Sequence, residues 1–456
     1  MITYKLKYKT SDEGNNFILN CMKQYSSLLH YGYNRVIDGW TAKQIKDSMK
    51  SQLNNVELMD SHIVSCAQQE ASGIYKIGNV SKLIFGGKKN FIKRCKGQIT
   101  KEEYQYNRLS PLLSMGEANQ KGNRKFRINY DLHTITFQID RNHHYILELK
   151  GIYGKREKIF SKLYKLQQRS EIPITYKLDK EYIYISFDET ILSNEKEIKK
   201  IENRIFAIDL NPNYVGWSVV DWKTSSDFKV IKSGVISIKQ INDKDFDLNG
   251  KGYSSESKER IYLSNKRNFE IYEISKKLIN TAIYYQCSIF SMEDLNIKSS
   301  DKNKGSKFNK LCNNLWNRTK LELNIQKRCN IFDIKLLKVK PQYSSFFGNF
   351  LYRDLQLPDM VLASIEIGRR GYEFYNQYII KTKEIKKNVI IPEIKDFYDR
   401  WIKSLEEFNV PGEINDLVDV YSYLKNAGTR YRVSLDDLKT EFSSCFSKTS
   451  LILKTI

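Results

Sequence analysis

Three carboxylates, Asp209, Glu293 and Asp359, stand out because of where they fall in the sequence. The first ends the apolar run RIFAID, the second ends another apolar run, CSIFSME, and the third opens DMVLASIEIG, whose apolar spacing is helical. Carboxyl ends of strands are where ligands gather in such sheets, and a helix N-terminus favours an ionised acid. If the two strands are neighbours, their acids lie side by side, which is unfavourable unless a cation joins them.

Carboxylate oxygens with no His or Cys nearby favour Mg²⁺ or Mn²⁺ over zinc. Two such ions about 3.5 to 4 Å apart, one activating water and one stabilising a leaving oxygen, hydrolyse phosphodiesters. For each acid taken singly, the alternative is a structural role, such as capping a helix or pairing with lysine. Asp354 competes with Asp359 as the third ligand, but Asp359 has the better context, with Ala363 and Ile367 on a packing face. The ordered trio in a basic chain therefore predicts a metal-dependent centre for phosphodiester hydrolysis.

The elements that must position these acids alternate between strand and helix after about residue 200. Three strands, a long helix over roughly 255 to 286, a strand ending at the second acid, a further strand in IKLLKVK and a helix from Asp359 are expected. This order predicts an α/β domain with a mixed sheet. Two amphipathic helices, in DFYDRWIKSLEEF and INDLVDVYSYLKNAG, follow it.

The first part of the chain has a different periodicity. Residues 2 to 8 alternate as a short strand, and the stretch from about 12 to 120 has mostly helical spacing. From about 124 to 190 the period is two, which predicts antiparallel strands of a small barrel or sandwich, with residues 2 to 8 as an extra strand. The helical stretch is then an insertion, and SNEKEIKKIEN is a linker.

The net charge of the chain is +22, from 75 Lys and Arg against 53 Asp and Glu. Such an excess favours a polyanionic partner, usually nucleic acid, although a solvated lysine-rich surface gives the same count. SKLIFGGKKNFIKRCKG and KGNRKFRINY mix cations with aromatic rings, a combination that contacts phosphates and stacks on bases. Amphipathic elements with their rings in the core are the alternative. The predicted nucleic-acid contacts are Lys88, Lys89, Lys93, Arg94, Lys121, Arg124, Lys125, Arg127, Arg369 and Arg370. For the last two, capping of the carboxyl end of their helix is the alternative.

Length and composition set further bounds. A chain of 456 residues favours two or three domains. No apolar stretch approaches the roughly 20 residues that span a bilayer, and the start has no apolar signal region. Seven cysteines without a CxxC pair are typical of reduced thiols. We therefore expect a cytoplasmic, nucleoid-associated protein of a prokaryotic or phage-infected cell, with no membrane partner.

Three segments carry a resemblance to a known family. IDLNPNYVGWSVV, FSMEDLNIK and PQYSSFFGN with PDMVLASIEIGRRG resemble the RuvC-type nuclease domain of the transposon-encoded TnpB family and of compact type V CRISPR effectors. The stretch from FGGKKNFIKRCKG to KGNRKFRI is similar to the amino-terminal half of phage- and element-borne members, and the resemblance extends to about residue 376. It implies a multi-domain α+β fold, in which a RuvC/RNase H-like α/β nuclease domain follows a small β-barrel wedge domain with a helical recognition insertion.

The resemblance also implies domain boundaries. Residues 1–10 would supply a strand of the wedge barrel, 11–121 the recognition domain, and 122–200 the rest of the barrel and the linker. Residues 201–376 would form the nuclease domain, and 377–456 a helical segment that completes it or is appended to it.

The implied function is that of an RNA-guided DNA endonuclease. Asp209, Glu293 and Asp359 would be its catalytic residues and the ligands of two Mg²⁺ or Mn²⁺ ions. The partners would be a guide RNA, its heteroduplex with target DNA and the displaced strand, bound by a monomer or by a homodimer on one RNA. A guided binder that no longer cuts, and a structure-selective nuclease without RNA, are the alternatives.

Two features near the acids qualify the resemblance. After Glu293, where the family has a mobile lid, lies a lysine-rich loop whose composition a plain loop would share. The lid residues would be Lys298, Lys302, Lys304 and Lys307. The zinc ribbon that the family often carries before the third acid has no cysteines here, and packing or surface roles are expected of Cys312, Cys329, His143 and His144. No zinc is predicted.

Overall fold

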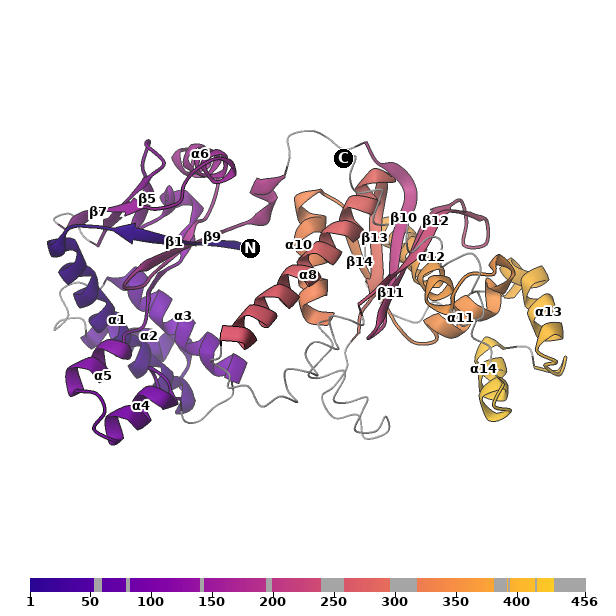
Figure 1. Ribbon diagram of the computed structural model, residues 1–456, viewed down its shortest axis with the longest axis horizontal. Helices are drawn as coiled ribbons and strands as arrows, with labels where there is room; N and C mark the ends of the chain where they lie inside the picture. The colour runs from indigo at the N-terminus through magenta and orange to yellow at the C-terminus, as the bar shows by residue number, and fades with distance from the viewer. Residues whose placement is uncertain are drawn as a thin grey trace. The chain divides into compact units, whose positions relative to one another are not determined.

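The computed structural model divides into two compact units, Met1–Leu192 and Ser193–Ile456 (Figure 1). It describes residues 1–52, 60–78, 83–139, 143–193, 199–238, 258–295, 318–380, 392, 394–414 and 416–429. Within these ranges no helix is long and apolar enough to cross a bilayer.

Unit 1 combines helices with short strands. Its helices are α1 (Asp12–Ile37), α2 (Ala42–Gln52), α3 (Ser61–Gly78), α4 (Lys88–Cys95), α5 (Lys101–Asn107) and α6 (Lys155–Gln168), with the short 3₁₀ helices η2 (Ala118–Gln120) and η3 (Glu189–Leu192). Its strands are β1 (Ile2–Lys9), β2 (Leu112–Ser114), β3 (Gly116–Glu117), β4 (Gly122–Asn123), β5 (Phe126–Ile128), β6 (Thr134–Gln138), β7 (His144–Leu149), β8 (Thr175–Leu178) and β9 (Tyr182–Phe187).

A seven-stranded antiparallel sheet organises unit 1, in the order β2-β8-β9-β1-β7-β6-β5. The sheet curls until it is nearly closed. Strand β5 is at one edge and β8 is next to the other edge, yet Phe126 of β5 stacks on Tyr176 of β8 with ring centroids 4.8 Å apart. Residues 2 to 8 therefore join the barrel as predicted, and as a central strand. Strands begin again at Leu112, whereas the helical insertion was expected to run to residue 121, and α6 was not predicted.

The helices and the barrel of unit 1 share one hydrophobic core. Cys21 and Tyr25 of α1 and Ala67 of α3 lie in the same buried cluster as Phe137 and Ile183 of the sheet. The segments 11–121 and 122–200, which the resemblance separates into two domains, thus pack together up to Leu192. Helices α4 and α5 differ from the others, because neither has a buried residue.

Unit 2 alternates strands and helices as the sequence predicts. Its strands are β10 (Ile201–Leu210), β11 (Tyr214–Trp222), β12 (Phe228–Ser237), β13 (Cys287–Glu293) and β14 (Lys335–Val339). Its helices are α8 (Lys258–Tyr284), α10 (Arg318–Ile331), α11 (Ser344–Leu351), α12 (Asp359–Ile380), α13 (Tyr398–Glu407) and α14 (Leu417–Asn426), with the 3₁₀ helices η5 (Arg353–Leu355) and η6 (Ile394–Phe397).

A five-stranded mixed sheet forms the centre of unit 2, in the order β12-β11-β10-β13-β14. Strands β10, β13 and β14 are parallel, whereas β11 is antiparallel to both of its neighbours. One face packs on α8 and α10, and the other on α11 and α12, with α13 and α14 beyond them (Figure 1). The mixed α/β sheet predicted for this region is confirmed.

Candidate active site

The sheet of unit 2 places Asp209 and Glu293 next to each other. Ile208 of β10 pairs with Met292 of β13 in parallel register, so the two acids are the next residues on neighbouring strands. Ala207 and Ile289 pack in the core cluster that contains α11 and α12, and side chains two or four residues further along a strand point to the same face. Both carboxylates therefore lie on the α12 face, at the end where the parallel strands finish.

Asp359 comes to the same end because α12 begins there. Asp209 is paired with Gly216 across β10 and β11. A Cβ atom on Gly216 would overlap the backbone carbonyl of Met360, the second residue of α12, so the glycine lets this helix start directly against β11. At the other end of the contact, a Cβ on Gly371 would lie 2.5 Å from Ser291 Oγ of β13. Close backbone approaches thus seat α12 on the two strands that flank β10.

We expect Gly216→Ala to lower the free energy of unfolding by roughly 1 to 3 kcal/mol, because the added methyl forces the first turn of α12 off the sheet. Gly368→Ala is the matched control, since Gly368 lies on the same helix and a Cβ there would make ordinary contact with Ala207 at 3.4 Å. The control should be neutral or slightly stabilising, because alanine is the better helix former. Denaturant unfolding of both variants checks this, and equal stability of the two would contradict it.

Glu293 is buried, with 7% of its surface exposed, and has identifiable partners. Ser344, the first residue of α11, donates a hydrogen bond from Oγ to its Oε1. Burial raises the pKa of Glu293, while the Ser344 hydrogen bond and the charge of Arg370 oppose that rise. A buried carboxylate whose ionised form is supported by two neighbours is typical of a functional site, although ion-pair networks produce the same pattern.

Asp209 and Asp359 are held by local contacts. Asn211, in the turn after β10, donates from Nδ2 to Asp209 Oδ2 over 2.6 Å. Asp359 Oδ1 accepts from the backbone N–H of Met360 at 2.7 Å, and the carbonyl of Asp359 lies 3.4 Å from the buried Asn349 Nδ2 of α11. Sequence reasoning did not single out Ser344 or Asn349 as contributors, although both fall in the quoted segment PQYSSFFGN.

The donor chemistry of the three acids fits a hard divalent cation such as Mg²⁺. Asp209 and Glu293 are both buried and lie at adjacent strand ends. In the part of the chain that the structure describes, however, no three His, Cys, Asp or Glu side chains are grouped closely enough to hold a metal ion. The backbone therefore gathers the acids at one end of the sheet, and their side chains must rearrange to share an ion.

Arg369 and Arg370, which were predicted to contact phosphate, lie in the interior of unit 2. Both are fully buried in α12, with 0% and 1% of their surfaces exposed. The buried Glu366 accepts from Arg369 Nε at 2.8 Å and Nη2 at 2.7 Å, and from Arg370 Nε at 2.8 Å. Burial alone would raise the pKa of Glu366, but the two guanidinium groups hold it below its usual value. These arginines face the interior of unit 2 and not a polyanion.

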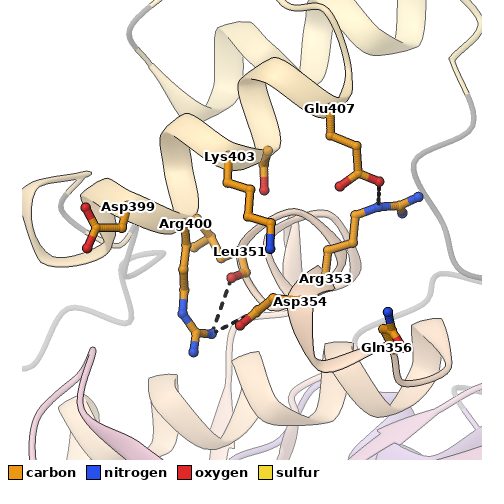
Figure 2. Close-up of a pocket in the computed structure, with 9 residues that line it drawn as sticks. Leu351, Arg353, Asp354, Gln356, Asp399, Arg400, Lys403 and Glu407 are labelled. Carbon is orange, nitrogen blue, oxygen red and sulfur yellow. Dashed lines mark hydrogen bonds and ion pairs between the residues drawn. The ribbon is translucent and has the colours of Figure 1, made fainter.

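Asp354, the competitor for the third ligand position, lies in a pocket between η5 and α13 (Figure 2). Its Oδ1 is 3.4 Å from Arg400 Nη1 of α13, and Arg353 in the same pocket pairs with Glu407. A carboxylate already paired with an arginine is a poor candidate for a cation site. The placement of Asp354 favours Asp359 as the third acid.

The cations of α4, defined as Lys88, Lys89, Lys93 and Arg94, lie on the surface of unit 1. On the same helix Phe91 is 43% exposed. Phe85, by contrast, packs against His30 with ring centroids 3.8 Å apart. Helix α4 therefore presents a basic surface with an accessible ring, as backbone-tracking nucleic-acid binding requires.

The second basic stretch is split between surface and interior. Lys121 is exposed, Arg124 is exposed but pairs with Glu117 at 2.8 Å, and Arg127 is half-buried and donates to the carbonyl of Phe126. Lys125 is buried and pairs with Asp60 Oδ2 at 2.7 Å, so it does not reach the surface as predicted.

His62 of α3 takes part in a buried network close to Lys125. Its ring nitrogens bridge Ser114 Oγ at 3.1 Å and Glu117 Oε1 at 2.9 Å. This network holds α3 on the barrel.

The structure describes some of the remaining residues named in the sequence analysis, and others lie outside it. The lid residues Lys298, Lys302, Lys304 and Lys307, and Cys312, lie outside the described residues. Cys329 is buried in α10, His143 stacks on Phe17 with ring centroids 5.2 Å apart, and His144 is exposed on β7.

Comparisons with known proteins add the following. Residues 1–197 match the family described as SSO2105 N-terminal domain. No curated protein matches the chain.

Among solved structures, the chain is similar to the protein of a Cas12f1-sgRNA-target DNA complex, with 15% identity over 78% of this chain and 83% of that one and a TM-score of 0.45. A CRISPR-Cas12f ternary complex gives 14% identity over 78% and 82% of the two chains and a TM-score of 0.27. A Cas12i(E894A)-crRNA-dsDNA complex gives 10% identity over 87% of this chain and 64% of that one, with a TM-score of 0.28.

Proposed function

We propose that this protein is an RNA-guided, divalent-metal-dependent DNA endonuclease whose centre is formed by Asp209, Glu293 and Asp359. The observation that supports this most is the register of β10 and β13, which puts Asp209 and Glu293 on adjacent strand ends and on one face. The seating of α12 on Gly216 brings Asp359 to the same end. The resemblance of the segments around these acids to RuvC-type nucleases supports the assignment of phosphodiester hydrolysis to this arrangement.

The proposed mechanism assigns each residue a task at the sheet end. Divalent ions bound there would activate water and stabilise the leaving oxygen of a phosphodiester. Asp209, oriented by Asn211, and Glu293, oriented by Ser344, would supply oxygen ligands from rigid strands. Asp359 would turn from its own helix backbone to supply the third. Ligands held on a sheet lose little freedom when the site forms, which favours precise positioning.

Guide and target would be held largely through their backbones. In RNA-guided systems base pairing reads the sequence, while the protein recognises shape and phosphate charge. The exposed cations of α4, in a chain whose net charge is +22, would supply such contacts. The buried Lys125, Arg369 and Arg370 are left out of this proposed interface.

Neutralising the α4 cations together, by substitution with glutamine, is expected to weaken RNA binding and to lower the salt dependence of the affinity. The logarithmic salt slope should fall by about 3, since each lost phosphate contact on a single strand contributes about 0.7. Filter binding from low to high salt measures the slope. Four glutamines at the exposed Lys155, Lys158, Lys165 and Arg169, in and beside α6, form the charge-matched control. An equal loss in both variants would mean that net charge alone binds the RNA.

The function itself is tested by expressing the full chain with its native flanking locus and sequencing the RNA that copurifies. The purified complex is then given double-stranded DNA that matches the RNA, with Mg²⁺ or with EDTA. We expect cleavage that needs Mg²⁺ and that moves to a new site when the guide segment of the RNA is replaced. DNA cleavage without any bound RNA would instead indicate a structure-selective nuclease. Guided binding without cleavage would indicate a protein that only occupies its target.

A further inference from the structure

The turn between β14 and α11 folds back over Glu293. Glu293 pairs with Val339 in the parallel register of β13 and β14, so the turn starts directly beside the carboxylate. Tyr343 in this turn has a left-handed backbone with φ of 60°, and Ser344 follows it as the first residue of α11. Ser344 Oγ lies 3.0 Å from the carbonyl of Pro341 and donates to Glu293 Oε1. The path of this turn therefore determines how Glu293 is held.

Arg370 of α12 contacts the backbone of the same turn. Its Nη1 donates to the carbonyl of Lys340 at 2.7 Å and to that of Gln342 at 2.8 Å. Its Nε is anchored on Glu366 one turn earlier in α12. A planar guanidinium makes such multiple contacts with little loss of freedom, which a lysine cannot reproduce. The neighbouring Arg369 is equally buried and also pairs with Glu366, and it donates to Glu373 in its own helix as well.

We propose that Arg370 is a positioning residue for Glu293, acting by holding the Lys340 and Gln342 carbonyls so that the turn presents Ser344 to the carboxylate. This inference rests on the proposed function, because it assigns Glu293 to a divalent cation. Groups that orient metal ligands from behind commonly change metal affinity by 10- to 100-fold when they are removed. Arg370 is thus expected to affect ion binding without touching the ion.

The test measures Mn²⁺ binding by electron paramagnetic resonance to the full chain, freed of nucleic acid in high salt. Arg370→Met and Arg370→Lys are each expected to weaken Mn²⁺ binding tenfold or more, the lysine variant because its single nitrogen cannot hold the two carbonyls and Glu366 at the same time. Arg369→Met is the matched control, since it removes a buried arginine from the same ion-pair network. Its Mn²⁺ affinity should stay within twofold of the unchanged protein, even though its thermal stability falls.

Ser344→Ala keeps the test decisive if the Arg370 variants do not fold. It removes one hydroxyl, so the chain should fold normally and Mn²⁺ binding should still weaken about tenfold. Full affinity in Ser344→Ala or Arg370→Lys, or an equal loss in Arg369→Met, overturns the positioning role. Glu293→Gln separates this result from a failure of the proposed function. If the unchanged protein binds Mn²⁺ no better than Glu293→Gln does, the metal site itself is absent and both proposals fall.

Discussion

Asp209→Ala should reduce DNA cleavage at least about a thousandfold, because losing one ligand of the proposed ions removes several kcal/mol of transition-state stabilisation. RNA and target DNA binding should change little, since the substitution removes a carboxylate at a strand end and no cation. The measurement is single-turnover cleavage of matched DNA in Mg²⁺, with target binding followed in parallel by gel shift. Removing Mg²⁺ with EDTA should mimic the variant, and restoring Mg²⁺ should rescue only the unchanged protein.

Asp221→Ala is the control for this prediction. Asp221 lies on β11 opposite Arg204 of β10, with which it forms a bidentate pair at 2.5 and 2.7 Å. It is an acid of the same sheet but stands toward the other end of the strands from Asp209. Its removal should cost some stability and leave the cleavage rate nearly unchanged. Unimpaired cleavage by Asp209→Ala, or a comparable loss in Asp221→Ala, would remove Asp209 from the proposed centre.

Glu366→Gln is expected to destabilise unit 2 by roughly 3 to 5 kcal/mol, because it leaves two buried guanidinium groups without their shared counter-charge. Arg369 retains Glu373, but Arg370 has only carbonyl acceptors among its remaining hydrogen bonds in the described residues. For a unit of this size the loss corresponds to a fall in melting temperature of roughly 10 °C. Thermal unfolding followed by circular dichroism measures it.

Glu407→Gln provides the comparison, since Glu407 pairs with Arg353 at the surface and its side chain is 44% exposed. Exposed ion pairs contribute at most about 1 kcal/mol, so this variant should melt within a few degrees of the unchanged protein. If Glu366→Gln and Glu407→Gln melted alike, the buried network would not be what stabilises α12.

Sequence periodicity was a good guide to the framework of unit 2, because strands and helices bury their apolar residues at fixed intervals. It therefore predicted the two strands that carry Asp209 and Glu293 at their carboxyl ends and the helix that begins at Asp359. Their mutual placement also depends on Gly216, whose importance comes from a backbone 144 residues away in the chain. No local pattern reveals such a contact.

Charge was harder to interpret than periodicity. Lys125 is predicted as a surface cation because its neighbours in the sequence are basic, and Arg369 and Arg370 are predicted to contact phosphate or to cap the end of their helix. Each is instead buried against an acid, Asp60 for the lysine and Glu366 for the arginines. Asp60 lies 65 residues before Lys125, so composition alone could not pair them. By contrast, α4 has no buried side chain, and its cations lie on the surface as the sequence pattern predicts.

The central position of β1 has a consequence for biosynthesis. This strand leaves the ribosome before its partners β7 and β9, and the β9 contacts extend to Phe187. At roughly 5 to 20 residues per second, β1 waits about ten to forty seconds for its second neighbour to be made. The intervening helices can form from local contacts, whereas the barrel cannot close. The nascent chain thus carries β1 without its β9 partner until residue 187 has been made, and codons that slow synthesis before that point would prolong its exposure to aggregation and to chaperones.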